Sequence, residues 1–225
     1  MQQPIWIGAP RQETSVLKWE LDPILSRSTV TLMSTSADQV FEIGTVLGCR
    51  TLGIPTSAAK TGGNTGAGTL GALALQGAAK VGAYSLTCIA AAVGGGVFAV
   101  FSPAGHRLAD AVVGTPYADP EIGFTLAHVG ADFIVGDGFV ITVPAGDGRS
   151  LPLNLAVLDG SHIAAAVLLN RVVVPATVDT NAVGLMGFGA VDGSTLIWPT
   201  GFTAPQIAAA TAQLAALSIK TLLEV

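Results

Sequence analysis

Alternation of apolar and polar positions over short stretches is the main pattern along this chain. The segment "STVTLMS" (28–34) alternates, and several segments between residues 60 and 143 do the same, separated by turns rich in Gly, Pro, Asn and Asp. A period of two indicates strands that bury one face, and turns at this spacing are typical of a β-sandwich or barrel. The pattern predicts strands at Leu70–Leu75, Gly82–Ala90, Gly96–Phe101, Arg107–Val113, Ile122–Leu126 and Phe139–Val143.

The pattern changes to a helical period near the C-terminus. Thr203 is suited to cap a helix that starts at Ala204, and Pro205 fits its first turn. The helix is expected to run to about Leu217, and "SIKTLLEV" (218–225) is expected to close the fold as a strand. One stripe of the helix would carry its apolar side chains, namely Ile207, Ala210, Leu214 and Leu217.

Two turn-rich breaks organise the chain. "GIPTSAAKTGGNTG" and "PAGDGRS" place boundaries near residues 59 and 144. We expect a discontinuous domain built from 28–58 and 145–225, which holds 60–143 as an inserted β-sandwich-like domain. Residues 1–27 carry three prolines and no sustained period, which favours an extended N-terminal arm. The fold class is therefore mainly β, with a small β-rich core, one C-terminal helix, an inserted β-domain and an arm.

The predicted arm carries large apolar side chains that have little local core to enter. Such groups usually bind a partner chain, although they would also be explained if the segment folds back on its own domain. The residues in question are Pro4, Trp6, Ile7, Leu17, Trp19 and Leu21.

The composition favours burial in an assembly or in a membrane. Only 11% of the residues are charged and 50% are hydrophobic, against about 25% charged in a typical soluble domain. The uncharged stretch between Lys80 and Arg107 is long enough to span a bilayer. However, it contains Gly94-Gly95-Gly96 and Pro103 and it alternates, which favours buried strands of a soluble domain. The N-terminus lacks the pattern of a signal peptide.

The glycine-rich stretch "TGGNTGAGTLGALALQG" (61–77) contains the spacing of a dinucleotide-binding loop at Gly66, Gly68 and Gly71. That loop needs a buried strand before it, a helix after it and an acidic residue about 20 positions on. Here a turn precedes the glycines, alternating positions follow them, and no Asp or Glu occurs between Glu42 and Asp110. We interpret these glycines as shaping the backbone, without binding phosphate.

No other motif indicates chemistry. Cys49 and Cys88 are isolated in the sequence, and the three histidines have no second ligand at metal-binding spacing. We find no arrangement of titratable residues typical of acid–base or nucleophilic catalysis. The net charge is −5 and no Lys/Arg cluster occurs, so direct nucleic-acid binding is not expected. The sequence therefore predicts a non-enzymatic protein with no cofactor, no metal, no nucleic acid and no membrane partner.

The two ends of the chain resemble the lambda-type head decoration proteins of tailed bacteriophages. The resemblance is carried by "SRSTVTLMS" with "VFEIGTVLG", by "VLDGSHIAAAVLLN", and by "LIWPTGFTAPQIAAATAQLAALSIKTL" with its Trp198-Pro199 pair. It covers roughly 28–58 and 150–225. Separately, 60–143 resembles a β-module that recurs inside phage structural proteins, and the simplest members of the decoration family lack such an insertion.

This resemblance implies a virion structural protein. Members of the family bind the expanded head as trimers, on its outer surface, and cement the major capsid protein. It implies a homotrimer made in the host cytoplasm, with the six apolar arm residues as capsid contacts and with Trp198, Pro199 and Leu214 in the core or the trimer contact. An alternative is an outward-displayed receptor- or glycan-binding module in 60–143, for which Tyr84, Tyr117, Phe98 and Phe101 are candidate residues.

Overall fold

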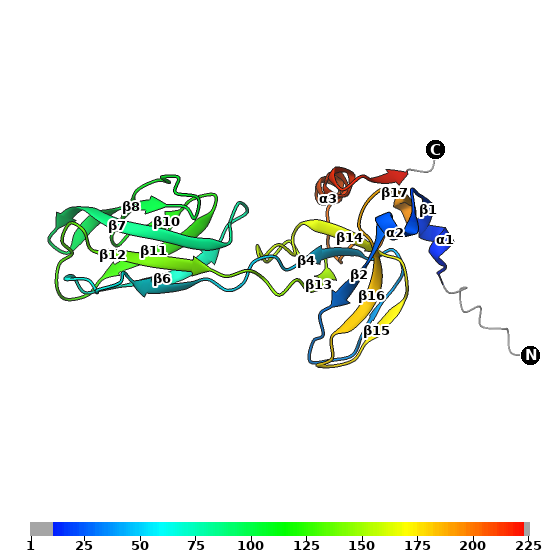
Figure 1. Ribbon diagram of the computed structural model, residues 1–225, viewed down its shortest axis with the longest axis horizontal. Coiled ribbons are helices and arrows are strands. Elements are labelled where there is room, and N and C mark those ends of the chain that lie inside the picture. Colours follow the sequence, from blue (N-terminus) through cyan, green and yellow to red (C-terminus); the bar gives the residue numbers. More distant parts are fainter. Residues whose placement is uncertain (1–10, 223–225) are drawn as a thin grey trace, which may run out of the picture. The chain divides into compact units, whose positions relative to one another are not determined.

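The protein is mainly β, which confirms the fold class predicted from the alternating pattern (Figure 1). The computed structural model describes residues 11–222. The chain divides into two compact units: unit 1 comprises the residues up to Arg50 and from Gly148 onward, and unit 2 comprises Thr51–Asp147. Unit 2 is thus wider at both ends than the predicted insertion of 60–143.

Unit 2 consists of two sheets that enclose one core. Its larger sheet has the order β5-β12-β7-β8-β9 and its smaller sheet the order β10-β11-β6. The sheets pack their inward residues into a first core cluster, in which Tyr84, Phe98 and Ile122 are completely buried. The strands are β5 (Thr56–Ala59), β6 (Gly68–Leu75), β7 (Gly82–Ala92), β8 (Gly95–Phe101), β9 (Ala111–Val112), β10 (Pro116–Ala118), β11 (Ile122–His128) and β12 (Gly138–Val143).

The alternating pattern located most of these strands. Five of the six predicted strands correspond to β6, β7, β8, β11 and β12. The sixth, expected over Arg107–Val113, is a strand only at Ala111–Val112, with an isolated bridge from Arg107 to Phe101. Strand β5 was missed because all four of its side chains are exposed, so it has no apolar alternation to detect.

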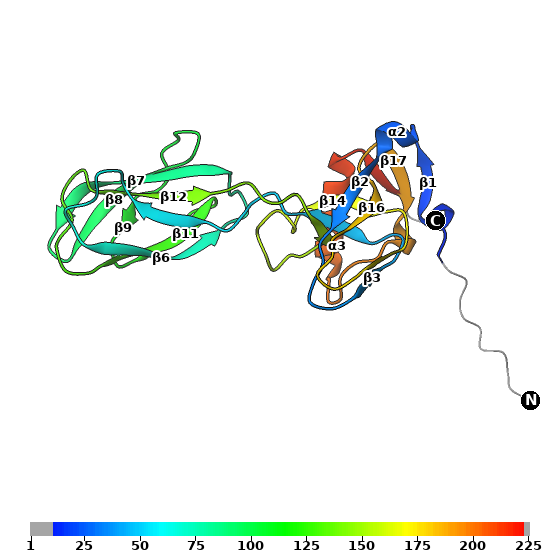
Figure 2. The same cartoon turned by 60° about the horizontal axis from the view of Figure 1, so that its bottom comes forward.

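Unit 1 is built around a closed five-stranded barrel of order β13-β2-β16-β14-β4 (Figure 2). A sheet of order β1-β17-β18 and the pair β15-β3 accompany the barrel. Two further core clusters fill this unit; the second contains Val16, Val191 and Leu214, and the third contains Leu32 and Leu168. The barrel strands are β2 (Arg27–Leu32), β4 (Val46–Cys49), β13 (Ser150–Pro152), β14 (Ala164–Leu168) and β16 (Thr180–Leu185), and the others are β1 (Leu17–Glu20), β3 (Gln39–Phe41), β15 (Val172–Val174), β17 (Gly189–Asp192) and β18 (Ile219–Leu222).

The predicted extended arm over residues 1–27 is wrong for its described part. Residues 11–27 form the short helices α1 (Glu13–Val16) and α2 (Pro23–Ser26) with β1 between them, and β1 pairs antiparallel with β17. Val16 is completely buried in the second core cluster. No helical or strand period of apolar residues was visible in this segment, because each element is only four residues long. In addition, a register shift interrupts β1 between Leu17 and Trp19.

The predicted C-terminal helix and strand are present. Helix α3 spans Ala204–Ala216, and the 3₁₀ turn η1 (Gly193–Thr195) precedes it. The side-chain oxygen of Gln206 accepts a hydrogen bond from the Thr203 N–H at 2.8 Å, which satisfies a main-chain donor at the start of the helix. Of the predicted stripe, Ala210 and Leu214 are buried. Of the strand predicted over 218–225, β18 covers Ile219–Leu222 and pairs in parallel with β17, and residues 223–225 lie outside the described part of the chain.

Candidate interaction surfaces

The turn between β1 and β2 brings apolar side chains to the surface of unit 1. Asp22 caps α2, since its Oδ1 accepts the Ile24 N–H at 2.7 Å. The helix is a single turn, so Ile24 and Leu25 have no second turn to pack against. They are 88% and 65% exposed.

Main-chain hydrogen bonds join this turn to the segment between β16 and β17. Leu21 donates its N–H to Phe188 O at 2.9 Å, and Met186 donates its N–H to Ser26 O at 2.8 Å. Phe188 is 51% exposed. These contacts define an apolar patch, because large exposed side chains from distant segments gather in one region. We define as the apolar patch the exposed apolar side chains of these joined segments, together with Leu217, whose carbonyl lies beside Gly187: Trp19, Leu21, Ile24, Leu25, Met186, Phe188 and Leu217.

An ionic network holds the base of the apolar patch. The Arg27 guanidinium bonds Glu20 at 2.6 and 2.8 Å and Glu13 at 2.6 Å. The hydrogen bonds to Glu20 contribute most to raising the pKa of Arg27, so the guanidinium stays charged. One side chain of β2 thereby ties α1 and β1 to the barrel.

The six residues expected to contact a capsid differ in their exposure and location. Trp19 and Leu21 are 57% and 56% exposed and belong to the apolar patch, while Leu17 is half-buried against the second core cluster. Pro4, Trp6 and Ile7 lie outside the described residues. The sequence analysis did not anticipate the patch residues Ile24, Leu25, Met186 and Phe188. The available signal for Ile24 and Leu25 was the helix start at Asp22-Pro23, which directly precedes these two apolar residues.

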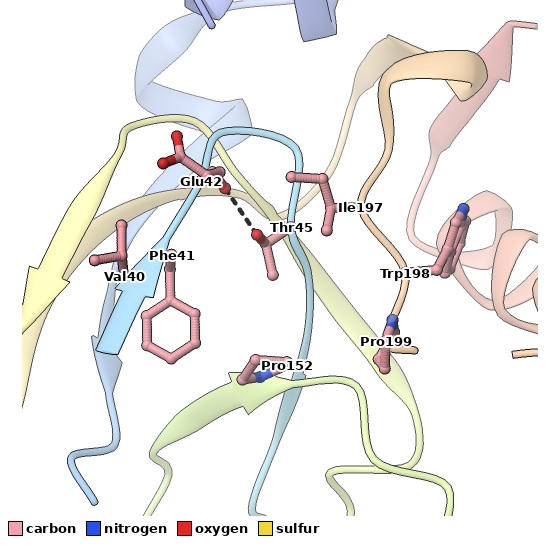
Figure 3. A pocket seen from close by; sticks show the side chains of 8 residues that line it. All are labelled: Val40, Phe41, Glu42, Thr45, Pro152, Ile197, Trp198 and Pro199. Atoms are coloured by element: carbon pink, nitrogen blue, oxygen red, sulfur yellow. Dashed lines mark hydrogen bonds between the residues drawn. The ribbon is translucent and has the colours of Figure 1, made fainter. Parts of the chain in front are cut away.

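A groove of about 260 Å³ lies in unit 1, next to the Trp198-Pro199 pair (Figure 3). Its lining is mainly apolar, and Thr45 Oγ1 donates to Glu42 O at its rim at 2.8 Å. The Trp198 ring points away from the other lining side chains and packs on the second core cluster. The lining residues are Val40, Phe41, Glu42, Thr45, Pro152, Ile197, Trp198 and Pro199.

The glycine-rich stretch of unit 2 surrounds a carboxylate of the same chain. Asp137 is 1% exposed and accepts the N–H groups of Thr65, Gly66 and Ile134 at 2.9 to 3.0 Å. Burial raises the pKa of this carboxyl, but the three N–H donors outweigh burial and hold the pKa below its usual range. These main-chain donors therefore bind a side chain of unit 2 in the way that a glycine loop binds an external anion.

Steric limits explain two glycines of the GxGxxG spacing. A Cβ on Gly66 would lie 2.6 Å from Phe133, and one on Gly68 would lie 2.3 Å from the Phe133 ring. A Cβ on Gly71 would meet nothing within 4 Å. The first two glycines let the main chain pass against a buried aromatic ring, as expected for backbone-shaping residues.

The aromatic residues considered for glycan binding lie mostly in the core of unit 2. Tyr84 and Phe98 are 0% exposed, and Tyr117 is 8% exposed and stacks on Phe124 at 4.5 Å. Burial raises the pKa of Tyr84 to about 12. Phe101 is half-buried. Because buried rings cannot stack on a sugar, no observation favours the receptor-binding alternative.

The remaining candidate groups are the two cysteines and the histidines. Cys88 is buried, and burial raises the pKa of its thiol; Cys49 is half-buried and its Sγ lies 3.4 Å from Gly148 O. His128 pairs with Asp132 at 3.0 Å. Over residues 11–222, no three potential ligands gather as a metal site would require, and no helix has the length and apolarity to cross a bilayer.

Comparison with known families identifies the chain. Residues 7–219 match the family described as "Bacteriophage lambda head decoration protein D". The chain belongs to this family of phage head decoration proteins. The match confirms the resemblance inferred from the terminal segments, and the β-module resemblance of 60–143 stays a prediction. Head decoration proteins are structural components that associate with the capsid of a phage virion.

Similarity to solved structures is limited. Two flagellar FlgL structures show 16% identity (Xanthomonas campestris) and 14% identity (Legionella pneumophila), with TM-scores of 0.32 and 0.31 over 47% and 48% of this chain. The chain spans about a third of the length of these proteins, 33% and 35%. No curated protein matches the chain.

Proposed function

We propose that this head decoration protein binds the expanded phage head as a homotrimer and cements it from the outer surface, without catalysis. The family match supports the capsid association. The apolar patch of unit 1 is the observation that carries the proposal, because its most exposed members offer a large apolar area with no partner inside the described chain. Such surfaces mark protein contacts.

The apolar patch is proposed as the contact with the major capsid protein. Trp19 contributes from β1 and Leu21 from the residue that follows this strand, and Ile24 and Leu25 extend the same surface. Aromatic anchors at the centre of a contact usually dominate its affinity, so Trp19 and Phe188 are expected to contribute most. Pro4, Trp6, Ile7 and Leu17 remain proposed capsid contacts of the N-terminal segment.

The trimer contact is proposed near the groove at Pro199 and Trp198. Leu214 is completely buried within unit 1, which supports its role in the core of the protomer. Three copies joined in this way would engage the shell together, and linked binding gains avidity without stronger individual contacts. The protein is then expected in the virion after synthesis in the host cytoplasm.

The experiment is a binding isotherm on expanded, undecorated heads, with the bound protein located by electron microscopy. Ile24→Asp should weaken binding at least tenfold, since it places a charge in an apolar contact. Val178→Asp is the matched control: Val178 is 55% exposed in unit 1 and belongs to the turn before β16, whereas the patch lies beyond the other end of that strand.

The outcomes separate the parts of the proposal. Equal binding of the Ile24→Asp and Val178→Asp variants would exclude the apolar patch as the capsid contact. Failure of the unmodified protein to bind any expanded head would contradict the cementing function itself. Sedimentation equilibrium of the free protein tests the trimer, and a monomer at all concentrations would overturn it. Pro199→Asp should shift a trimer toward monomer without changing the fold.

A further inference from the structure

The first described residue of the chain is anchored beside the groove of unit 1 that Figure 3 shows. The Arg11 guanidinium donates from Nη1 to Thr195 O at 2.6 Å and to Ile43 O at 3.4 Å. Ile43 directly follows Glu42, which lines the groove. The main chain at Arg11 therefore lies within reach of one arginine side chain from the rim of the groove.

The turn under Arg11 is built for this close contact. Gly44 has a φ of +91°, in the left-handed region that favours glycine. A Cβ on Gly44 would lie 2.8 Å from Thr195 O and 3.5 Å from Arg11 Nη1. Gly44 O also accepts the Ile197 N–H at 2.8 Å, and Ile197 lines the groove. The anchor of Arg11 and one wall of the groove thus share a single turn.

The groove is a mainly apolar hollow whose one charged lining residue already has a partner. Phe41, Pro152 and Ile197 lie around the hollow (Figure 3). Glu42 is the charged residue among those that line it, and its carboxylate pairs with Arg171 at 2.9 Å. A segment that fills this groove therefore needs apolar side chains and no charge of its own.

The ten residues before Arg11 provide such a segment. They read "MQQPIWIGAP" and contain no charged side chain. Their apolar run, "PIWI" (4–7), is four to seven residues away from Arg11, and an extended chain of that length spans at most about 14 to 25 Å. A ligand tethered so closely reaches an effective concentration of about 1 mM, and an intrinsic Kd of about 0.1 mM would then fill about nine grooves in ten.

We propose that the "PIWI" segment of the same chain occupies this groove in the free protein, with the Trp6 ring inside it. A large aromatic side chain buries more apolar area than any other and is a frequent anchor of a contact. The tether at Arg11 favours the groove of the same protomer, because a second copy offers its segment only at its concentration in solution.

The groove would hold the segment until the protein meets the head. This consequence rests on the proposed function, in which Pro4, Trp6 and Ile7 are capsid contacts. The head must then draw the segment out of the groove, so its apolar side chains stay covered before assembly. The trimer contact is proposed beside the groove, at Pro199 and Trp198, and a filled groove does not exclude it.

The test places a photo-cross-linker at residue 6 of the full chain. Trp6→p-benzoylphenylalanine keeps a large aromatic side chain at this position. After irradiation of the dilute free protein and digestion with trypsin, peptide 1–11 should be joined to a peptide that carries groove residues. These peptides are 28–50, 150–171 and 172–220. The cross-linked product should have the mass of a single chain.

Val40→Asp should empty the groove, because it places a charge in an apolar wall. Val40 is 49% exposed, so the variant should keep its fold, which circular dichroism checks. The yield of the cross-link should fall at least fivefold. The matched control is Val178→Asp, at a 55% exposed residue of unit 1 that does not line the groove, and it should leave the yield unchanged.

A second measurement needs no cross-linker. In the full chain labelled with 5-fluorotryptophan, the ¹⁹F signal that Trp6→Phe removes should show the small solvent isotope shift of a covered ring. Val40→Asp should raise this shift to that of a fully exposed ring, whereas Val178→Asp should not change it.

Any of three results would overturn the proposal. The first is a fully exposed Trp6 signal in the otherwise unmodified chain. The second is a cross-link outside the three groove peptides, or a product with the mass of two chains, which would assign the segment to a second copy. The third is an equal effect of Val40→Asp and Val178→Asp. All of these measurements use the free protein, so they stand even if the protein fails to bind heads, and the two proposals can fail separately.

Discussion

The carboxylate of Asp137 accepts the main-chain N–H of Gly66 at 2.9 Å, across 71 residues of sequence. This contact joins the glycine-rich turn to the turn that precedes β12. Thr65 and Ile134 donate to the same carboxylate. A buried, ionised side chain with three main-chain donors is an organising centre of unit 2.

Asp137→Asn should destabilise unit 2 by about 2 kcal/mol, since hydrogen bonds to a charged acceptor are stronger than those to a neutral one. Urea denaturation monitored through the tyrosine signal measures this loss of stability of unit 2. Both tyrosines lie in unit 2, and all three tryptophans lie outside it. The tryptophan-detected transition of unit 1 should not change. An equal shift of both transitions would contradict the assignment of Asp137 to unit 2 alone.

Acidification should remove the stabilisation that the ionised Asp137 carboxylate gives to unit 2. The pKa of Asp137 in the folded protein lies below its ordinary value of 3.8. The carboxylate therefore stabilises the fold above its unfolded pKa, and this contribution is lost as the pH falls through the folded value. The stability difference between the unmodified protein and Asp137→Asn should be constant from pH 5 to pH 7 and shrink below about pH 4. A difference that grows on acidification would contradict this sign.

Gly66→Ala and Gly68→Ala should each destabilise unit 2 by about 1–3 kcal/mol, the usual cost of overpacking. The added methyl group would lie within 2.6 Å of Phe133 in the first case and 2.5 Å from Ala127 O in the second. Gly71→Ala is the matched control from the same motif, because its methyl group meets nothing within 4 Å. Calorimetry with nucleotides should show no binding for any of these proteins, and tight binding would contradict the backbone-shaping role.

Removal of unit 2 should leave unit 1 folded. Arg50 donates its N–H to Arg149 O at 2.9 Å and accepts from the Gly148 N–H at 3.0 Å, so the ends to be joined are already paired. A short Gly/Ser linker in place of 51–147 should preserve the circular dichroism of the barrel and the tryptophan fluorescence of unit 1. Loss of the folded signal would show that unit 2 is integral to the fold.

Leu214→Ala should destabilise unit 1 by about 2–5 kcal/mol, since it empties a completely buried site on α3. Leu217→Ala, at a residue that is 37% exposed, is the control and should cost less than about 1 kcal/mol. Tryptophan-detected urea denaturation measures both. Equal effects would mean that α3 is not held by its Leu214 face.

Deletion of residues 2–10 is the appropriate test of the N-terminal segment in capsid binding. A longer deletion to residue 20 would remove β1, and with it Val16 from the second core cluster. The shorter deletion should weaken binding to expanded heads while unit 1 stays folded, which circular dichroism checks. Affinity equal to that of the full chain would exclude this segment as a contact.

The sequence by itself determined the elements whose side chains alternate or follow a helical stripe. Strands β7 and β12 bury alternate positions, and α3 begins after Thr203 with a proline in its first turn, so local patterns were sufficient. The family resemblance was also readable, because it rests on short stretches such as the Trp198-Pro199 segment.

Only the tertiary structure decided the role of the N-terminal residues and the location of both candidate surfaces. Residues 11–27 looked like an arm because their partners, Phe188 and β17, lie far away in sequence. Likewise, the groove is formed by β3, β13 and the segment at Ile197, which are distant in sequence. Exposure and concavity are properties of packing between distant segments, and no local period encodes them.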